Sequence, residues 1–133
     1  MYNHRMKKEV IELSKQLRRL HKDLLDFQVL IHQDLTGKKL GPYEILHLSI
    51  QDPEFAWLRK LSEMIVAIDI QEEENSNLQK SDFDKIKAEV NHLLFSENEL
   101  NHDFQFRYQN ALGKKPELSI HQAQLMKSLS LFG

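Results

Sequence analysis

Three glutamate and histidine pairs stand three residues apart in this sequence, a spacing that can bind a metal ion. The pairs are Glu44 with His47, Glu89 with His92, and Glu99 with His102. Residues three apart on a helix are neighbours, and di-iron helical bundles use such pairs as metal ligands. Because the chain has no cysteine, any metal would need histidine or carboxylate ligands.

A buried metal site would require these side chains to face the interior of a bundle, and their helical positions argue against it. At about 100° per residue, His92 lies roughly 130° from the apolar face of its segment, and Glu99 and His102 lie roughly 140° or more from theirs. A weaker surface site between His92, Glu99 and His102 would need a bend at Ser96. A metal-binding bundle that uses Glu89, His92, Glu99 and His102 is the alternative hypothesis for function.

Motifs for catalysis and for phosphate binding are missing from the sequence. No glycine-rich phosphate loop occurs, and no Gly-x-Ser-x-Gly motif surrounds Ser119, which lies two residues from His121. No acidic residue at a characteristic spacing supports His121 either. We therefore expect no catalytic residue and no cofactor.

Lys8, Lys15 and Lys22 recur every seven residues and form a basic stripe along the first predicted helix. Such stripes can bind nucleic-acid backbones or acidic partners. However, 18 Lys and Arg residues are balanced by 20 Asp and Glu residues, and no aromatic residues interleave with the stripe. We expect a solvated surface, or pairing with the acidic run at residues 72–74, rather than nucleic-acid binding.

Helices are expected to carry all of these residues, because apolar residues recur at intervals of three and four along the chain. Residues 6–35 form the longest such segment, and Gly37 can end it in the left-handed conformation. Further helices are predicted over residues 43–50, 53–70, 81–95 and 100–113, and from residue 116 onwards. We predict an all-α fold, a compact antiparallel helical bundle of about four to six helices, as one domain over residues 1–133.

Local signals place the helix ends. Asp52 and Pro53 are expected to open the helix over residues 53–70, and residues 72–77, which begin with three glutamates, are expected to form a polar connection after it. Ser81 and Asp84 resemble a capping box, and a break is expected near Phe95.

The predicted helix over residues 53–70 is apolar on two sides. One face includes Trp57, and the other includes Phe55, Val66 and Ile70. Such a helix has to be covered on both sides, so it is either the central element of the domain or half of a subunit interface. Large side chains and an arginine are enriched at interface hot spots as well as in cores, and core packing is the favoured interpretation for Phe55, Trp57 and Arg59. The candidate interaction residues are Phe55, Trp57, Arg59, Val66 and Ile70.

The run Asp52-Pro53-Glu54-Phe55-Ala56-Trp57-Leu58-Arg59-Lys60-Leu61-Ser62 resembles a segment of small uncharacterised bacterial all-helical proteins. Residues 17–22 and 106–109 are similar as well, so the resemblance covers most of the chain. It implies a compact helical fold. It carries over no activity, cofactor or catalytic residue.

These observations favour a non-enzymatic helical bundle that acts as a protein-interaction or regulatory module and associates with itself, as a homodimer. The N-terminal residues contain basic side chains without an apolar stretch behind them, and no apolar run reaches the roughly 20 residues of a membrane span. We therefore expect no membrane partner and a cytoplasmic location.

Overall fold

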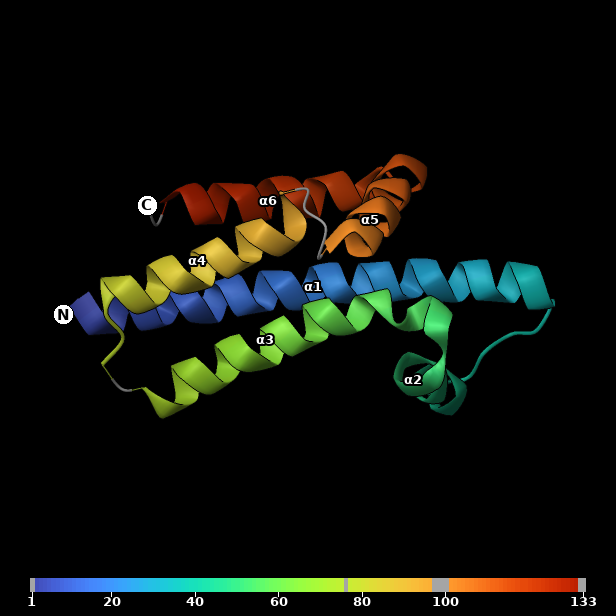
Figure 1. The fold of residues 1–133 in the computed structure, drawn as a ribbon, viewed down its shortest axis with the longest axis horizontal. Helices are drawn as coiled ribbons and strands as arrows, with labels where there is room; N and C mark the ends of the chain where they lie inside the picture. The colour runs from blue at the N-terminus through green and yellow to red at the C-terminus, as the bar shows by residue number, and fades with distance from the viewer. Residues whose placement is uncertain (1, 76, 97–100, 132–133) are drawn as a thin grey trace.

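The computed structural model describes residues 2–75, 77–96 and 101–131, which contain six α-helices and no strand (Figure 1). The elements are α1 (Tyr2–Thr36), α2 (Pro42–Gln51), the 3₁₀ turn η1 (Pro53–Phe55), α3 (Trp57–Glu74), α4 (Lys80–Leu94), α5 (His102–Lys114) and α6 (Glu117–Leu131). α3 and α6 run antiparallel to α1, one on each side of it. The predicted all-α bundle is confirmed.

The 35-residue helix α1 is the central element, and it packs most extensively against α3 and α6. Its apolar residues at intervals of three and four are buried between these neighbours: Val10, Leu13, Leu17, Leu20, Leu24 and Phe27. The helix is followed by Gly37, which adopts a left-handed φ of 72° and donates its amide to the Gln33 carbonyl at 2.8 Å. The predicted helix and its stop signal are confirmed.

The segment around α3 differs from the prediction at both ends. Asp52 accepts a hydrogen bond from the Glu54 amide at 2.8 Å, but the turn that it caps is η1, and α3 begins only at Trp57. At the other end, the acidic residues expected in a loop belong to the last turn of α3. The Lys7 Nζ atom lies 3.7 Å from the Glu72 Oε1 atom, which offsets the unfavourable charge at this helix end.

The start of α4 corrects the predicted capping box at Ser81 and Asp84. Gln79 is the residue before the helix, and Asp82 accepts a hydrogen bond from its amide at 3.0 Å, so the box lies two residues earlier. Leu78 and Phe83 are both buried and stand at the positions of a hydrophobic staple, which explains this register. The break predicted near Phe95 is confirmed, because α4 ends at Leu94.

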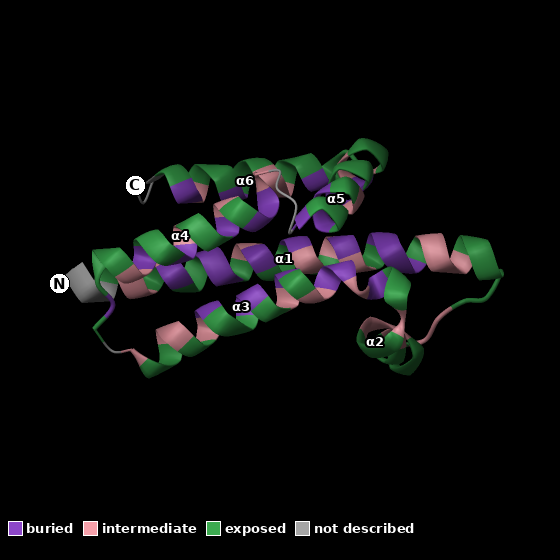
Figure 2. Cartoon of the chain, viewed as in Figure 1, coloured by how far each residue is buried: buried purple, intermediate pink, exposed green. Residues whose placement is uncertain are grey.

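Burial is uneven over the molecule (Figure 2). α3, α4 and α5 each turn buried residues towards the interior, whereas α2 contains no buried residue and lies at the C-terminal end of α1.

None of the helices, over the residues described, is both long enough and apolar enough to span a bilayer.

Candidate functional site

The predicted metal ligands do not form a cluster within the described residues. Glu89, His92 and His102 have exposed side chains, and Glu99 lies outside the described part of the chain. The pair on α2 is exposed as well. Among the residues that the structure describes, no three His, Cys, Asp or Glu side chains lie close enough together to hold a metal ion.

Two of the predicted interaction residues, Phe55 and Trp57, belong to the core of the monomer. Trp57 is buried, and its Nε1 donates to the Gln28 Oε1 atom at 3.0 Å. Phe55 is fully buried and meets the His32 ring edge-on, with centroids 5.9 Å apart. The predicted grouping of Phe55 with Val66 and Ile70 on one helical face is therefore wrong, because Phe55 belongs to η1 and α3 begins only at Trp57.

Arg59 connects two elements within the molecule. Its Nε donates to the Ser49 carbonyl at 3.1 Å, in the last turn of α2, where a cation is favoured by the helix dipole. The Nη2 atom of the same side chain is buried and has no hydrogen-bond partner among the described residues. In this structure Arg59 attaches α2 to α3.

Val66 and Ile70 are the members of the predicted interaction set that leave apolar surface outside the monomer. They lie one turn apart on the outward side of α3 and are 54% and 46% exposed. Beside them, the Asp69 carboxylate accepts hydrogen bonds from Ser14 and Arg18 of α1. This apolar patch is therefore small and is bordered by an ion pair.

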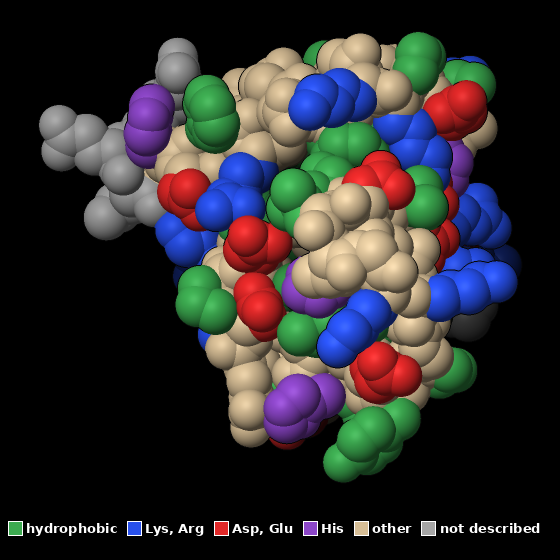
Figure 3. Space-filling model, turned by 90° about the vertical axis from the view of Figure 1, so that its right-hand side faces the viewer, with side chains coloured by type: hydrophobic (Ala, Val, Ile, Leu, Met, Phe, Trp, Pro, Cys, Tyr) green, Lys and Arg blue, Asp and Glu red, His purple; other side chains and the backbone are tan. Residues whose placement is uncertain are grey.

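A larger apolar surface, which the sequence analysis missed, lies on α2. Tyr43, Leu46 and Ile50 share one face of this helix and are between 59% and 80% exposed. Ile45 and Leu48 occupy the opposite face and are half-buried. Hydrophobic side chains reach the surface at the lower edge of Figure 3, towards which α2 lies in this view. The sequence signal that could have revealed this surface was the presence of apolar residues on both faces of a ten-residue helix.

The basic stripe of α1 is exposed along its length at Lys8, Lys15 and Lys22. Neighbouring cations on α1 are engaged within the molecule, Arg18 with Asp69 and Lys7 with Glu72. Pairing between the first helix and the acidic run thus occurs, through Lys7 instead of the stripe itself.

His121 has an acidic partner that its sequence neighbourhood does not reveal. Its Nδ1 atom lies 3.1 Å from the Asp23 Oδ2 atom, which joins α6 to α1. Ser119 is exposed and lies two residues away on the helix, so it projects from a different side. The ion pair of His121 and Asp23 links α6 to α1 and does not include Ser119.

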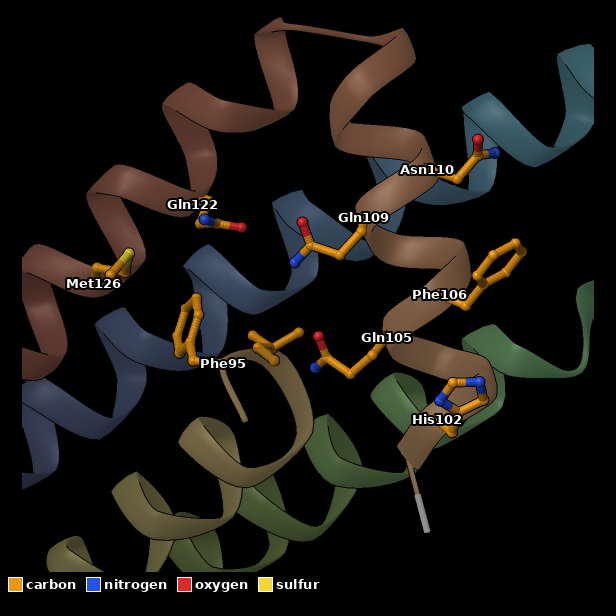
Figure 4. A pocket seen from close by; sticks show the side chains of 9 residues that line it. Phe95, His102, Gln105, Phe106, Gln109, Asn110, Gln122 and Met126 are labelled. Atoms are coloured by element: carbon orange, nitrogen blue, oxygen red, sulfur yellow. The ribbon is translucent and has the colours of Figure 1, made fainter. Parts of the chain in front are cut away.

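A cleft of about 750 Å³ lies where the end of α4 meets α5 and α6 (Figure 4). Gln109 of α5 and Gln122 of α6 point towards one another across it, and Gln105 points towards the end of α4, near Phe95. No Lys, Arg, Asp or Glu is among its described lining residues. The sequence analysis did not detect this cleft, because its three walls come from separate helices.

No known family model matches the chain, and no curated protein or solved structure shows significant similarity to it. The resemblance of residues 52–62 to small bacterial helical proteins therefore stays a prediction.

Proposed function

We propose that the protein is a non-enzymatic binding module that associates with a second copy of itself through α2. The observation that carries this proposal is the apolar face formed by Tyr43, Leu46 and Ile50, all of which are more than half exposed. Their spacing of three and four residues is that of a seam between two packed helices. Isolated exposed apolar residues are common on proteins, whereas three on one face of a short helix indicate a binding surface.

The limited packing of α2 supports the same proposal. A helix of ten residues is marginal on its own in water, and α2 has no buried residue. Burying a large apolar side chain contributes about 1.5–3 kcal/mol, so a partner helix would stabilise α2 as well as hold the two copies together. A two-fold axis would place this apolar face against the same face of the partner.

The outward patch of α3 is the second candidate for the contact. It contains two large apolar residues, Val66 and Ile70, and the adjacent ion pair of Arg18 and Asp69 limits its extent. We favour α2 because its face is larger and more exposed.

Sedimentation velocity over loading concentrations from about 1 μM to about 300 μM, the range of weak interfaces, tests the proposal. We expect the wild type to shift from monomer to dimer across this range. The double variant Leu46→Glu with Ile50→Glu should remain monomeric, because the contact would bury two carboxylates against an apolar face. The matched variant Val66→Glu with Ile70→Glu should dimerise like the wild type.

Two outcomes would contradict the proposal. A wild type that stays monomeric at the highest concentration would rule out self-association in this range. A dimer that is lost only in the α3 variant would place the contact on α3 and exclude α2.

A further inference from the structure

The cleft between α4, α5 and α6 contains a glutamine whose amide has a fixed orientation. Gln105 is only 7% exposed, and its Nε2 donates a hydrogen bond to the carbonyl oxygen of Leu93 at the end of α4. A carbonyl can only accept, so the NH₂ group of Gln105 must face Leu93. The amide oxygen of Gln105 accepts no hydrogen bond from any described residue, and it remains available as an acceptor at the wall of the cleft.

Gln122 presents the complementary group from α6. Its Oε1 atom accepts a hydrogen bond from the hydroxyl of the buried Tyr108 at 2.7 Å, a length typical of an O–H donor. With its oxygen engaged, Gln122 has the two N–H groups of its amide left to donate. Gln109, which faces Gln122 in Figure 4, is exposed and can turn to either role.

The remaining walls determine which ligand suits these groups. Leu94, Phe95 and Met126 supply apolar surface, and aromatic rings favour stacking with a flat partner. The described lining contains no Lys, Arg, Asp or Glu to pair with a phosphate or a carboxylate, and its one titratable side chain, His102, lies at the first turn of α5, away from Gln109 and Gln122 (Figure 4). A volume of about 750 Å³ is in the range of small-molecule sites and is large enough for a heterocycle with a further substituent.

We infer that this cleft binds a neutral, flat heterocycle with a lactam edge, the chemistry of a pyrimidine base. The ligand's N–H would donate to the amide oxygen of Gln105, and its carbonyl would accept from the amide of Gln122. Phe95 and Met126 would cover the ring. This inference concerns a different surface from the α2 contact and does not depend on it.

Titration with three probes, followed by the side-chain amide signals of the glutamines in ¹H–¹⁵N spectra, tests the inference. Uracil is the neutral lactam, 1,3-dimethyluracil has the same ring without N–H donors, and orotate is the same ring with a carboxylate. We expect uracil to shift the amide signals of Gln105, Gln109 and Gln122. Each of the other two probes should bind at least about threefold more weakly, the effect of losing one hydrogen bond or of leaving a charge unpaired.

Variants then locate the binding site. Gln122→Met keeps the side-chain length without the amide and should weaken uracil binding at least about threefold. Because this change also removes the partner of Tyr108, Gln109→Met provides a second variant at an exposed position. Gln124→Met is the matched control, because Gln124 is an exposed glutamine that belongs to α6, as Gln122 does, but it does not line the cleft. This variant should bind uracil like the wild type.

The inference is overturned if saturating uracil shifts none of the three amide signals. It is also overturned if orotate binds as well as uracil, or if both Gln122→Met and Gln109→Met bind uracil as tightly as Gln124→Met.

Discussion

At the scale of single residues, the contact between Trp57 and Gln28 shows how a polar pair is accommodated in the core. Both residues are buried, and one hydrogen bond of 3.0 Å joins them between α3 and α1. A buried donor that loses its partner costs about 1–3 kcal/mol. The pair therefore makes the packing of these two helices specific, since a shifted arrangement would leave the indole N–H unpaired.

Replacing Gln28 tests this role. Gln28→Leu removes the acceptor and leaves the Trp57 Nε1–H buried without a partner, so we expect the free energy of unfolding to fall by about 1–2 kcal/mol. Urea denaturation followed by the fluorescence of Trp57, the only tryptophan, measures the change. Gln124→Leu at an exposed position is the control and should change stability by less than about 0.5 kcal/mol. Equal stabilities of the two variants would show that the hydrogen bond does not contribute.

His21 makes the stability depend on pH. Burial lowers the pKa of this histidine below its usual value of 6.5, because the charged form loses hydration. The ion pair of Arg18 and Asp69 lies in the same shallow hollow. The unfolded chain therefore binds a proton at a higher pH than the folded chain, and the free energy of unfolding should fall as the pH drops from above 6.5 to below it.

The comparison of His21→Gln with the wild type isolates this contribution. We expect the variant to lose less stability than the wild type between about pH 7.5 and pH 5.5, measured by urea denaturation at each pH. His47→Gln at an exposed position serves as the control and should retain the wild-type dependence. An unchanged dependence in His21→Gln would contradict the role given to burial.

The residue patterns in the sequence predicted which side chains are buried better than they predicted which side chains contact each other. The spacing of apolar residues predicted an apolar face that includes Trp57, and Trp57 is buried in the structure. The same reasoning could not find the hydrogen bond between Trp57 and Gln28, or the pairing of His121 with Asp23, because each contact joins helices that are distant in sequence. Periodicity gives the direction of a side chain about its own helix axis and contains no information about the neighbouring helix.

At the scale of elements, replacing Gly37 or Gly113 by alanine should change the free energy of unfolding in opposite directions. Gly37 has a left-handed φ of 72°, whereas Gly113 lies within α5, and a Cβ atom would meet nothing within 4 Å at either position. Gly37→Ala should lower the free energy of unfolding by about 1 kcal/mol, the cost of a left-handed alanine. Gly113→Ala should raise it by about 0.5 kcal/mol, because alanine favours a helix.

Thermal denaturation of the two variants under identical conditions measures both effects. Changes of opposite sign in the free energy of unfolding would support a left-handed backbone requirement at residue 37, where α1 ends. A stabilised Gly37→Ala variant would show that residue 37 does not require the left-handed conformation.

Helix boundaries were predictable where a backbone constraint acts alone. Gly37 and Pro42 marked the end of α1 and the start of α2 correctly. The start of α4 was misplaced because Ser81 and Asp84 satisfy the capping pattern equally well, and the burial of Leu78 selects Gln79 instead. Local signals thus give several candidate ends, and tertiary packing chooses between them.

At the scale of the whole molecule, α2 stands apart from the other helices. α1, α3 and α6 lie side by side along the bundle, whereas α2 is held at one end, partly through the hydrogen bond from Arg59 to Ser49. The sequence pointed to residues 53–70 as the two-sided apolar helix, because only the folded chain reveals that η1 turns Phe55 inwards. The candidate interaction surface in the structure is therefore the apolar face of α2. The cleft beside α5 could not be predicted from the sequence, because three helices form it.

The most direct test of the proposed self-association is the distance between identical spin labels in the dimer. Because the chain has no cysteine, His47→Cys places one label at an exposed position on α2. Lys127→Cys places one in the second half of α6, a helix whose C-terminal end lies at the opposite end of the bundle from α2 in Figure 1. A two-fold contact through α2 predicts an interlabel distance below about 30 Å for position 47, a few helix diameters, and a longer one for position 127. No dipolar signal at high concentration, or a shorter distance at position 127 than at position 47, would contradict the α2 contact.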